Sequence, residues 1–216
     1  MHMGTGTLLR ALPHEMPVPT CFVLTGGEQM KMTLYHIGYQ EIRTPDIHQG
    51  RKNADFGQGF YLSDDAEFSR RWAKERSGFS VYLNKYELET DKLKIKRLSR
   101  NEEWFTYIFA NRSVQPDRFA EYDVIIGPIA NDTLYDTLGI TTSGFLTPEQ
   151  ATRTLLIGPL YSQIVLKTEK AAAALRFLSA EILKSEEIAK YRESLQQEEK
   201  QFQKQFAKLI EEMLGD

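Results

Sequence analysis

Between Met32 and Leu166 the chain alternates short apolar stretches with turn residues, and this pattern constrains the fold more than any other feature. Stretches of this length, rich in β-branched and aromatic residues, are typical of strands rather than of helices. The predicted strands are 32–36, 60–62, 80–88, 93–98, 122–128 and 163–166. Helices are expected between them, the first with Ser63 as its N-cap, the second over 102–110 and two short ones within 132–156. Because these strands need not be parallel, we predict an α+β fold with a split, mainly antiparallel sheet.

The two ends of the chain differ from this central part. Residues 1–31 contain Gly, Pro and Thr at positions that break a helix, and we predict a weakly structured lead-in, with an edge strand over 20–24 as the alternative. From Thr168 onward the composition favours helix throughout. We therefore predict a core domain over 32–178 and a C-terminal helical extension over 179–216.

Apolar residues in the C-terminal extension recur every seven positions, at Ile188, Leu195, Phe202 and Leu209. Such a stripe is typical of an amphipathic helix that packs on its own domain. It is also compatible with a coiled coil or a partner-binding arm. The sequence leaves both interpretations open.

The overall composition excludes several classes of function. Lys and Arg total 27 against 30 for Asp and Glu, so a net charge of −3 argues against a broad nucleic-acid-binding surface. One cysteine, Cys21, and four histidines provide neither a disulfide framework nor a zinc-binding motif, so no metal is expected. No apolar run approaches the roughly 20 residues that span a bilayer. These features predict a cytoplasmic protein.

The segment from Gly50 to Ala73, GRKNADFGQGFYLSDDAEFSRRWA, is the most informative part of the chain. Two glycines flank Gln58 just before an aromatic strand, which allows a close backbone approach. Ser69 and Trp72 lie three residues apart and share a helix face. This arrangement predicts either a pocket with an aromatic wall and a hydroxyl or a cluster of core aromatics.

The same segment resembles a known family. GQGFYLSD, followed by Ser69 and Trp72, is similar to the G-K-G-[IV]-Y-F-[AS]-D…S-x-x-[YW] signature of diphtheria-toxin-type ADP-ribosyltransferases, and Leu34-Tyr35-His36 lies upstream where that family has a histidine-bearing strand. The run from LYH to QIVLKTEKA also resembles the bacterial domain-of-unknown-function family 3990. The resemblance covers about residues 32–178.

The resemblance implies a role for each matching residue, with NAD as co-substrate. His36 would hydrogen-bond the adenosine-side ribose, and the backbone of Ile37 would hold the nicotinamide amide, although the family usually has glycine there. Tyr61 would stack on the nicotinamide, Ser69 would bond its carboxamide, and Trp72 would close the other side of the ring. Arg51 either meets the NAD pyrophosphate or is a solvated loop charge.

Gln163 departs from the family pattern, because the polymerising enzymes have a glutamate at the start of this strand. A carboxylate there stabilises the oxocarbenium character that develops when the nicotinamide bond breaks. Glutamine is uncharged and cannot act as a base, so elongation of a polymer is not expected, and Asp132 is a candidate for a compensating acid. On this view Gln163→Glu should raise NAD hydrolysis.

These features predict an NAD-dependent mono-ADP-ribosyltransferase, with His36, Tyr61 and Gln163 in the catalytic positions and an unidentified macromolecular acceptor. A toxin or anti-phage role would imply a neutralising protein partner. The alternative is a catalytically silent domain that binds NAD or ADP-ribose and engages a partner through its C-terminal helix. A purely structural interaction module, which would not bind NAD, is a third interpretation.

Overall fold

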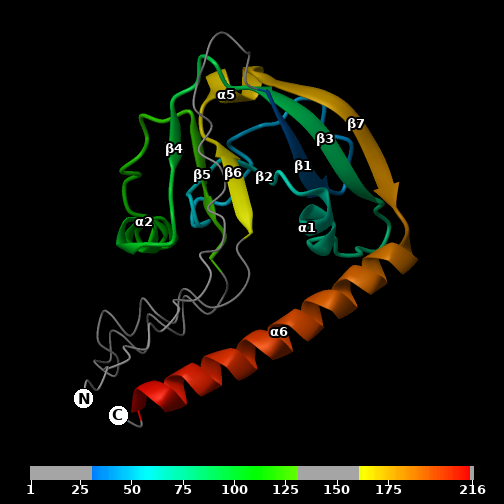
Figure 1. Cartoon of the computed structure of the whole chain (residues 1–216). Coiled ribbons are helices and arrows are strands. Elements are labelled where there is room, and N and C mark those ends of the chain that lie inside the picture. Colours follow the sequence, from blue (N-terminus) through cyan, green and yellow to red (C-terminus); the bar gives the residue numbers. More distant parts are fainter. Residues whose placement is uncertain (1–30, 131–160, 215–216) are drawn as a thin grey trace, which may run out of the picture.

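The computed structural model describes residues 31–130 and 161–214, and in that part of the chain seven strands form two sheets (Figure 1). The first sheet is antiparallel, in the order β1 (Lys31–Gly38), β3 (Val81–Glu89), β7 (Leu175–Leu183). The second has the order β2 (Phe60–Leu62), β6 (Ser162–Leu166), β5 (Val124–Pro128), β4 (Ile95–Arg97), and its β4–β5 pair is parallel. The predicted α+β class and the split, mainly antiparallel sheet are confirmed.

The two sheets meet where β1 passes β2. The Tyr35 and Ser63 backbones bond each other in both directions, with N···O distances of 2.8 and 3.0 Å. The main apolar cluster is buried and includes Leu34, Tyr86 and Ile164, which are fully buried. Beyond the bridge no further backbone hydrogen bond joins the described residues of β1 and β2, and β1 also contacts helix α1 (Ala66–Arg71).

The helices that flank the sheets begin at polar caps. Asp65, rather than the predicted Ser63, caps α1, accepting a hydrogen bond from the Phe68 N–H at 3.1 Å, while Ser63 Oγ accepts from the Asp65 N–H. The carboxylate reaches a free N–H of the first turn, so the helix begins two residues later than predicted. Asn101 caps α2 (Glu102–Arg112), which packs Trp104 and other apolar side chains against the second sheet.

The prediction of continuous helix after Thr168 is wrong for one segment. A short helix, α5 (Glu169–Ala173), is followed by strand β7, and only then by the long helix α6 (Ser185–Leu214). β7 pairs with β3 along its length and buries Leu175 and Leu183. Ladder hydrogen bonds and apolar burial outweigh the helix propensity of its residues.

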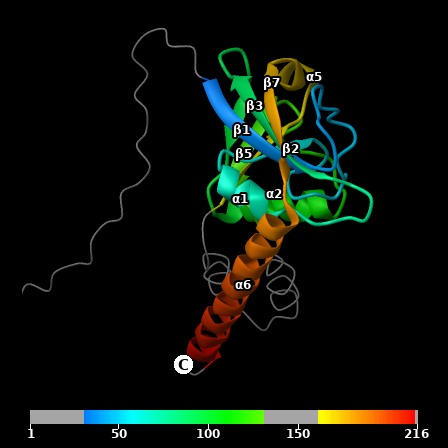
Figure 2. The same cartoon turned by 90° about the vertical axis from the view of Figure 1, so that its right-hand side faces the viewer.

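The first half of α6 packs on its own domain. Ile188 is buried among Ala73, Val81 and Leu183, and the Tyr191 hydroxyl donates to Glu67 on α1 at 2.7 Å. Figures 1 and 2 show the rest of the helix continuing away from the two sheets. The domain limits at 31/32 and 178/179 stay predictions, and the second of them falls inside β7.

Several predictions fall on residues outside the described part of the chain. These are the lead-in, its alternative strand, the helices expected within 132–156, and the candidate acid Asp132. Within residues 31–130 and 161–214, none of the helices has the length and apolar character needed to cross a membrane.

Candidate functional site

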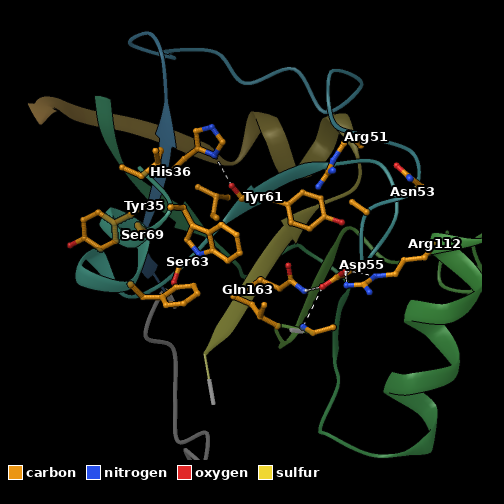
Figure 3. A pocket seen from close by; sticks show the side chains of 17 residues that line it. Tyr35, His36, Arg51, Asn53, Asp55, Tyr61, Ser63, Ser69, Arg112 and Gln163 are labelled. Carbon is orange, nitrogen blue, oxygen red and sulfur yellow. Dashed lines mark hydrogen bonds and ion pairs between the residues drawn. The ribbon is translucent and has the colours of Figure 1, made fainter. Parts of the chain in front are cut away.

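A pocket of about 460 Å³ opens where the two sheets separate (Figure 3). Its walls come from β1, β2, α1, β6, the loop before β2 and the end of α2. The lining includes the seven residues predicted to bind NAD or to occupy the catalytic positions: His36, Ile37, Arg51, Tyr61, Ser69, Trp72 and Gln163. Segments more than a hundred residues apart in the sequence therefore converge on one cavity.

His36 is held as a neutral imidazole. Its Nδ1 lies 2.8 Å from the Tyr61 carbonyl oxygen, and because a carbonyl only accepts, Nδ1 carries the proton. The ring also packs on Phe60 with centroids 4.5 Å apart. Burial lowers the pKa of His36, which keeps Nε2 unprotonated and available as an acceptor.

The peptide groups of Ile37 lie on the pocket side of β1. Tyr35 uses both its N–H and its C=O toward β2, and residues two apart on a strand direct these groups to the same edge. Ile37 is in extended backbone, since Val114 alone among the described non-glycine residues has a positive φ. The departure from glycine therefore causes no strain here and leaves the two backbone groups directed to the same side.

Tyr61 is fixed through its hydroxyl. The O–H donates to the Gly57 carbonyl at 2.7 Å and accepts from the Phe56 N–H at 3.0 Å. Gly57 has φ +72°, a conformation that glycine adopts without a steric penalty. Burial raises the pKa of Tyr61 strongly, so the phenol stays neutral and its ring forms a rigid wall of the pocket.

Helix α1 supplies a hydroxyl and an exposed indole. Ser69 is buried and donates to the Asp65 carbonyl at 2.9 Å, so its oxygen lone pairs remain as acceptors for a ligand N–H. Trp72 caps the C-terminus of α1 and is 55% exposed, although it packs edge-on against Phe68. An aromatic surface left exposed at a pocket is suited to stacking with a planar ligand.

Gln163 lies at the floor of the pocket beside an acid that the sequence did not single out. Its Nε2 donates to Oδ2 of Asp55 at 3.4 Å, and the Ala130 N–H donates to the same oxygen at 3.3 Å. The other oxygen, Oδ1, receives Nε of Arg112 at 2.8 Å and pairs with its Nη2 at 2.6 Å. Figure 3 shows this chain of contacts along one side of the pocket.

The described lining of the pocket carries a net positive charge. Among the described lining residues, Arg51 and Arg112 are cationic, Asp55 is the one carboxylate, and His36 is neutral. Figure 3 shows the Arg51 side chain directed toward the cavity. An excess of one positive charge favours a ligand with anionic groups.

Comparison with known protein families identifies the family of this chain. A family model described as "Protein of unknown function (DUF3990)" matches residues 32–177, more than half of the chain. The chain belongs to the DUF3990 family. Its matched region begins in β1 and ends in β7, and so contains every pocket residue.

Comparisons beyond the family are sparse for this DUF3990 protein. No curated protein matches its sequence. A solved structure that it resembles is a chain of the M. tuberculosis MbcT–MbcA toxin–antitoxin complex, with a TM-score of 0.43 and 12% identity, over 76% of this chain and 89% of the other.

The sequence did not indicate two charged residues in the pocket of the DUF3990 domain, Asp55 and Arg112. Asp55 stands in the glycine-flanked segment, but nothing in its local pattern separated it from a solvated loop charge. Arg112 reaches the pocket from the last turn of α2, and its placement depends on how that helix packs. No short-range signal marks either residue.

Proposed function

We propose that this DUF3990 protein is an NAD-dependent ADP-ribosyltransferase that transfers a single ADP-ribose unit. The observation that supports the proposal most strongly is the convergence of all seven predicted residues on one pocket. Their chemistry is complementary to NAD, because the described part of the cavity combines aromatic surfaces, a neutral imidazole acceptor and the backbone groups of Ile37 with a net positive charge.

In the proposed complex each part of NAD meets a matching group. The nicotinamide ring lies between Tyr61 and Trp72, its carboxamide bonds Ser69 and the Ile37 backbone, and the distal ribose donates a hydroxyl to His36 Nε2. Arg51 meets the pyrophosphate. Stacking of this kind contributes about 0.5–1.5 kcal/mol beyond the burial of surface.

The proposed reaction breaks one bond and forms one. The electron pair of the glycosidic C–N bond moves to the pyridinium nitrogen, so nicotinamide leaves as a neutral molecule. The acceptor then bonds the ribose carbon and loses a proton. An uncharged Gln163 cannot remove that proton, so we expect single transfer or slow hydrolysis, with the acceptor's own acidity or a residue of the acceptor setting the rate.

Two assays test this proposal. Purified protein with NAD should release nicotinamide, and labelled NAD in host lysate should transfer label to a macromolecule. Both signals should disappear in His36→Ala and Tyr61→Ala. The matched control is Tyr82→Ala, on β3 outside the pocket lining, which should retain both. Release that is equal in all four proteins would refute the proposed site.

A second candidate function is NAD or ADP-ribose binding without catalysis, with α6 engaging a partner. The residue that favours it is Gln163. Calorimetric binding of NAD with no nicotinamide release would support this alternative. The identity of the acceptor and a neutralising protein partner stay predictions in either case.

A further inference from the structure

We infer that Asp55 is a positioning residue that fixes the amide of Gln163 with its carbonyl oxygen facing the substrate. The inference deepens the proposed function and rests on it. It arises from a contact that no sequence pattern indicates, between the glutamine at the usual carboxylate position and the one carboxylate among the described pocket residues.

The orientation of the Gln163 amide follows from the charge of its neighbour. A carboxylate accepts hydrogen bonds and does not donate them, so it stabilises the amide with Nε2 toward Asp55. The flipped amide would place two acceptor oxygens about 3.4 Å apart. Figure 3 shows the result, with the amide oxygen turned away from Asp55 and into the pocket.

Asp55 is itself held so that it cannot turn away. Arg112 occupies Oδ1, the Ala130 N–H lies on Oδ2, and the Asn111 side chain donates to the Asp55 carbonyl at 3.2 Å. The side chains of Asp55 and Arg112 are 15% and 9% exposed. A partly buried carboxylate with both oxygens engaged is a rigid reference for the amide beside it.

This arrangement gives Gln163 part of the function of a glutamate. Its fixed carbonyl oxygen can accept from a ribose hydroxyl, and the adjacent negative charge polarises the amide so that more negative charge resides on that oxygen. The favourable interaction of this oxygen with the ribose strengthens as the ribose becomes cationic, so it stabilises the transition state more than the bound substrate. Removing the orientation should therefore lower kcat more than it changes KM.

Asp55 also changes the expectation for Gln163→Glu. A glutamate would place its carboxylate against that of Asp55, and the repulsion between the two negative charges would be only partly offset by the Arg112 guanidinium. We therefore expect the single substitution to impose a new pH dependence on kcat rather than a simple gain in activity.

A swap of the two groups provides the test. Asp55→Asn, Gln163→Glu and the double variant Asp55→Asn/Gln163→Glu are compared with wild type for nicotinamide release and NAD affinity. Asp55→Asn should lower kcat by about 10- to 100-fold, the usual effect of losing a partner that orients a site residue. The double variant restores one amide facing one carboxylate, so it should recover most of that loss.

The control is Asp123→Asn, which removes another ion-paired carboxylate of similar exposure, bonded to Lys170 and Thr168 outside the pocket lining. It should lower stability and leave kcat unchanged. Two results would overturn the inference while wild-type activity upholds the proposed function. One is an unchanged kcat in Asp55→Asn. The other is a double variant whose kcat is no higher than the product of the two single effects predicts. A wild type that neither binds nor cleaves NAD would overturn the proposed function itself.

Discussion

Replacing Tyr61 with phenylalanine separates the two roles that the structure gives this side chain. The substitution keeps the ring in the pocket and removes the hydroxyl that bridges the Phe56 N–H and the Gly57 carbonyl at 3.0 and 2.7 Å. A buried donor or acceptor that loses its hydrogen-bond partner lowers the free energy of unfolding by about 1–3 kcal/mol. Because the loop is only partly buried and can admit water, we expect one such cost in total rather than two.

Chemical denaturation should show this loss directly. The free energy of unfolding should fall by about 1–3 kcal/mol in Tyr61→Phe, and melting should fall by about 2–4 °C per kcal/mol for a chain of this size. Nicotinamide release at saturating NAD should persist, because the stacking ring remains. KM for NAD should rise as the loop around Gly57 loosens.

The control is Tyr82→Phe on β3, a half-exposed tyrosine outside the pocket lining, for which a change within about 0.5 kcal/mol is expected. Equal stability of the two variants would refute the buried position of the Tyr61 hydroxyl. Loss of kcat in Tyr61→Phe comparable to that in Tyr61→Ala would refute the view that the ring surface, rather than the hydroxyl, contacts the nicotinamide.

Three further predictions concern His36, Gly59 and Glu198. Burial lowers the pKa of His36 below 6.5, so as the pH falls the unfolded chain binds a proton at His36 before the folded protein does. The free energy of unfolding of wild type relative to that of His36→Gln should therefore decrease as the pH drops below 6.5. A difference between the two proteins that stays constant across pH 5–8 would contradict this. In Gly59→Ala the new Cβ would lie 2.5 Å from the Leu166 carbonyl oxygen, so the free energy of unfolding should fall by about 1–3 kcal/mol and the denaturation midpoint should fall with it. A midpoint equal to that of wild type would show that the two strands can move apart without loss of stability. Glu198→Gln removes the ion pair at 2.6 Å with Arg71, which is worth about 1 kcal/mol or less at this exposure, so hydrogen exchange in α1 should quicken. Unchanged exchange would mean that this ion pair does not stabilise α1.

The strands around the site were predictable because local pattern and tertiary structure agree there. His36 and Tyr61 lie on strands that are visible in the sequence as short apolar and aromatic stretches, and the bridge between Tyr35 and Ser63 then brings those strands together. The N-cap of α1 is Asp65, two residues after the predicted Ser63, because Asp and Ser side chains are both suited to cap a helix.

The parts that sequence could not provide depend on contacts between distant segments. Strand β7 consists largely of residues that also suit a helix, and its state is decided by the free edge of β3. Asp55 and Arg112 meet only because α2 packs against the loop before β2, and their ion pair is what brings a carboxylate to Gln163. No periodicity or spacing encodes such a contact.

Tryptophan fluorescence offers the most direct test of nicotinamide binding between Tyr61 and Trp72. The chain has two tryptophans, of which Trp104 is 1% exposed and Trp72 is 55% exposed, so a ligand at the pocket should alter the emission of Trp72 alone. We predict a saturable change on titration with NAD that is absent in Trp72→Phe, a variant that calorimetry should show still binds NAD. Calorimetric binding of NAD to wild type with no change in emission, or no binding at all, would contradict the account.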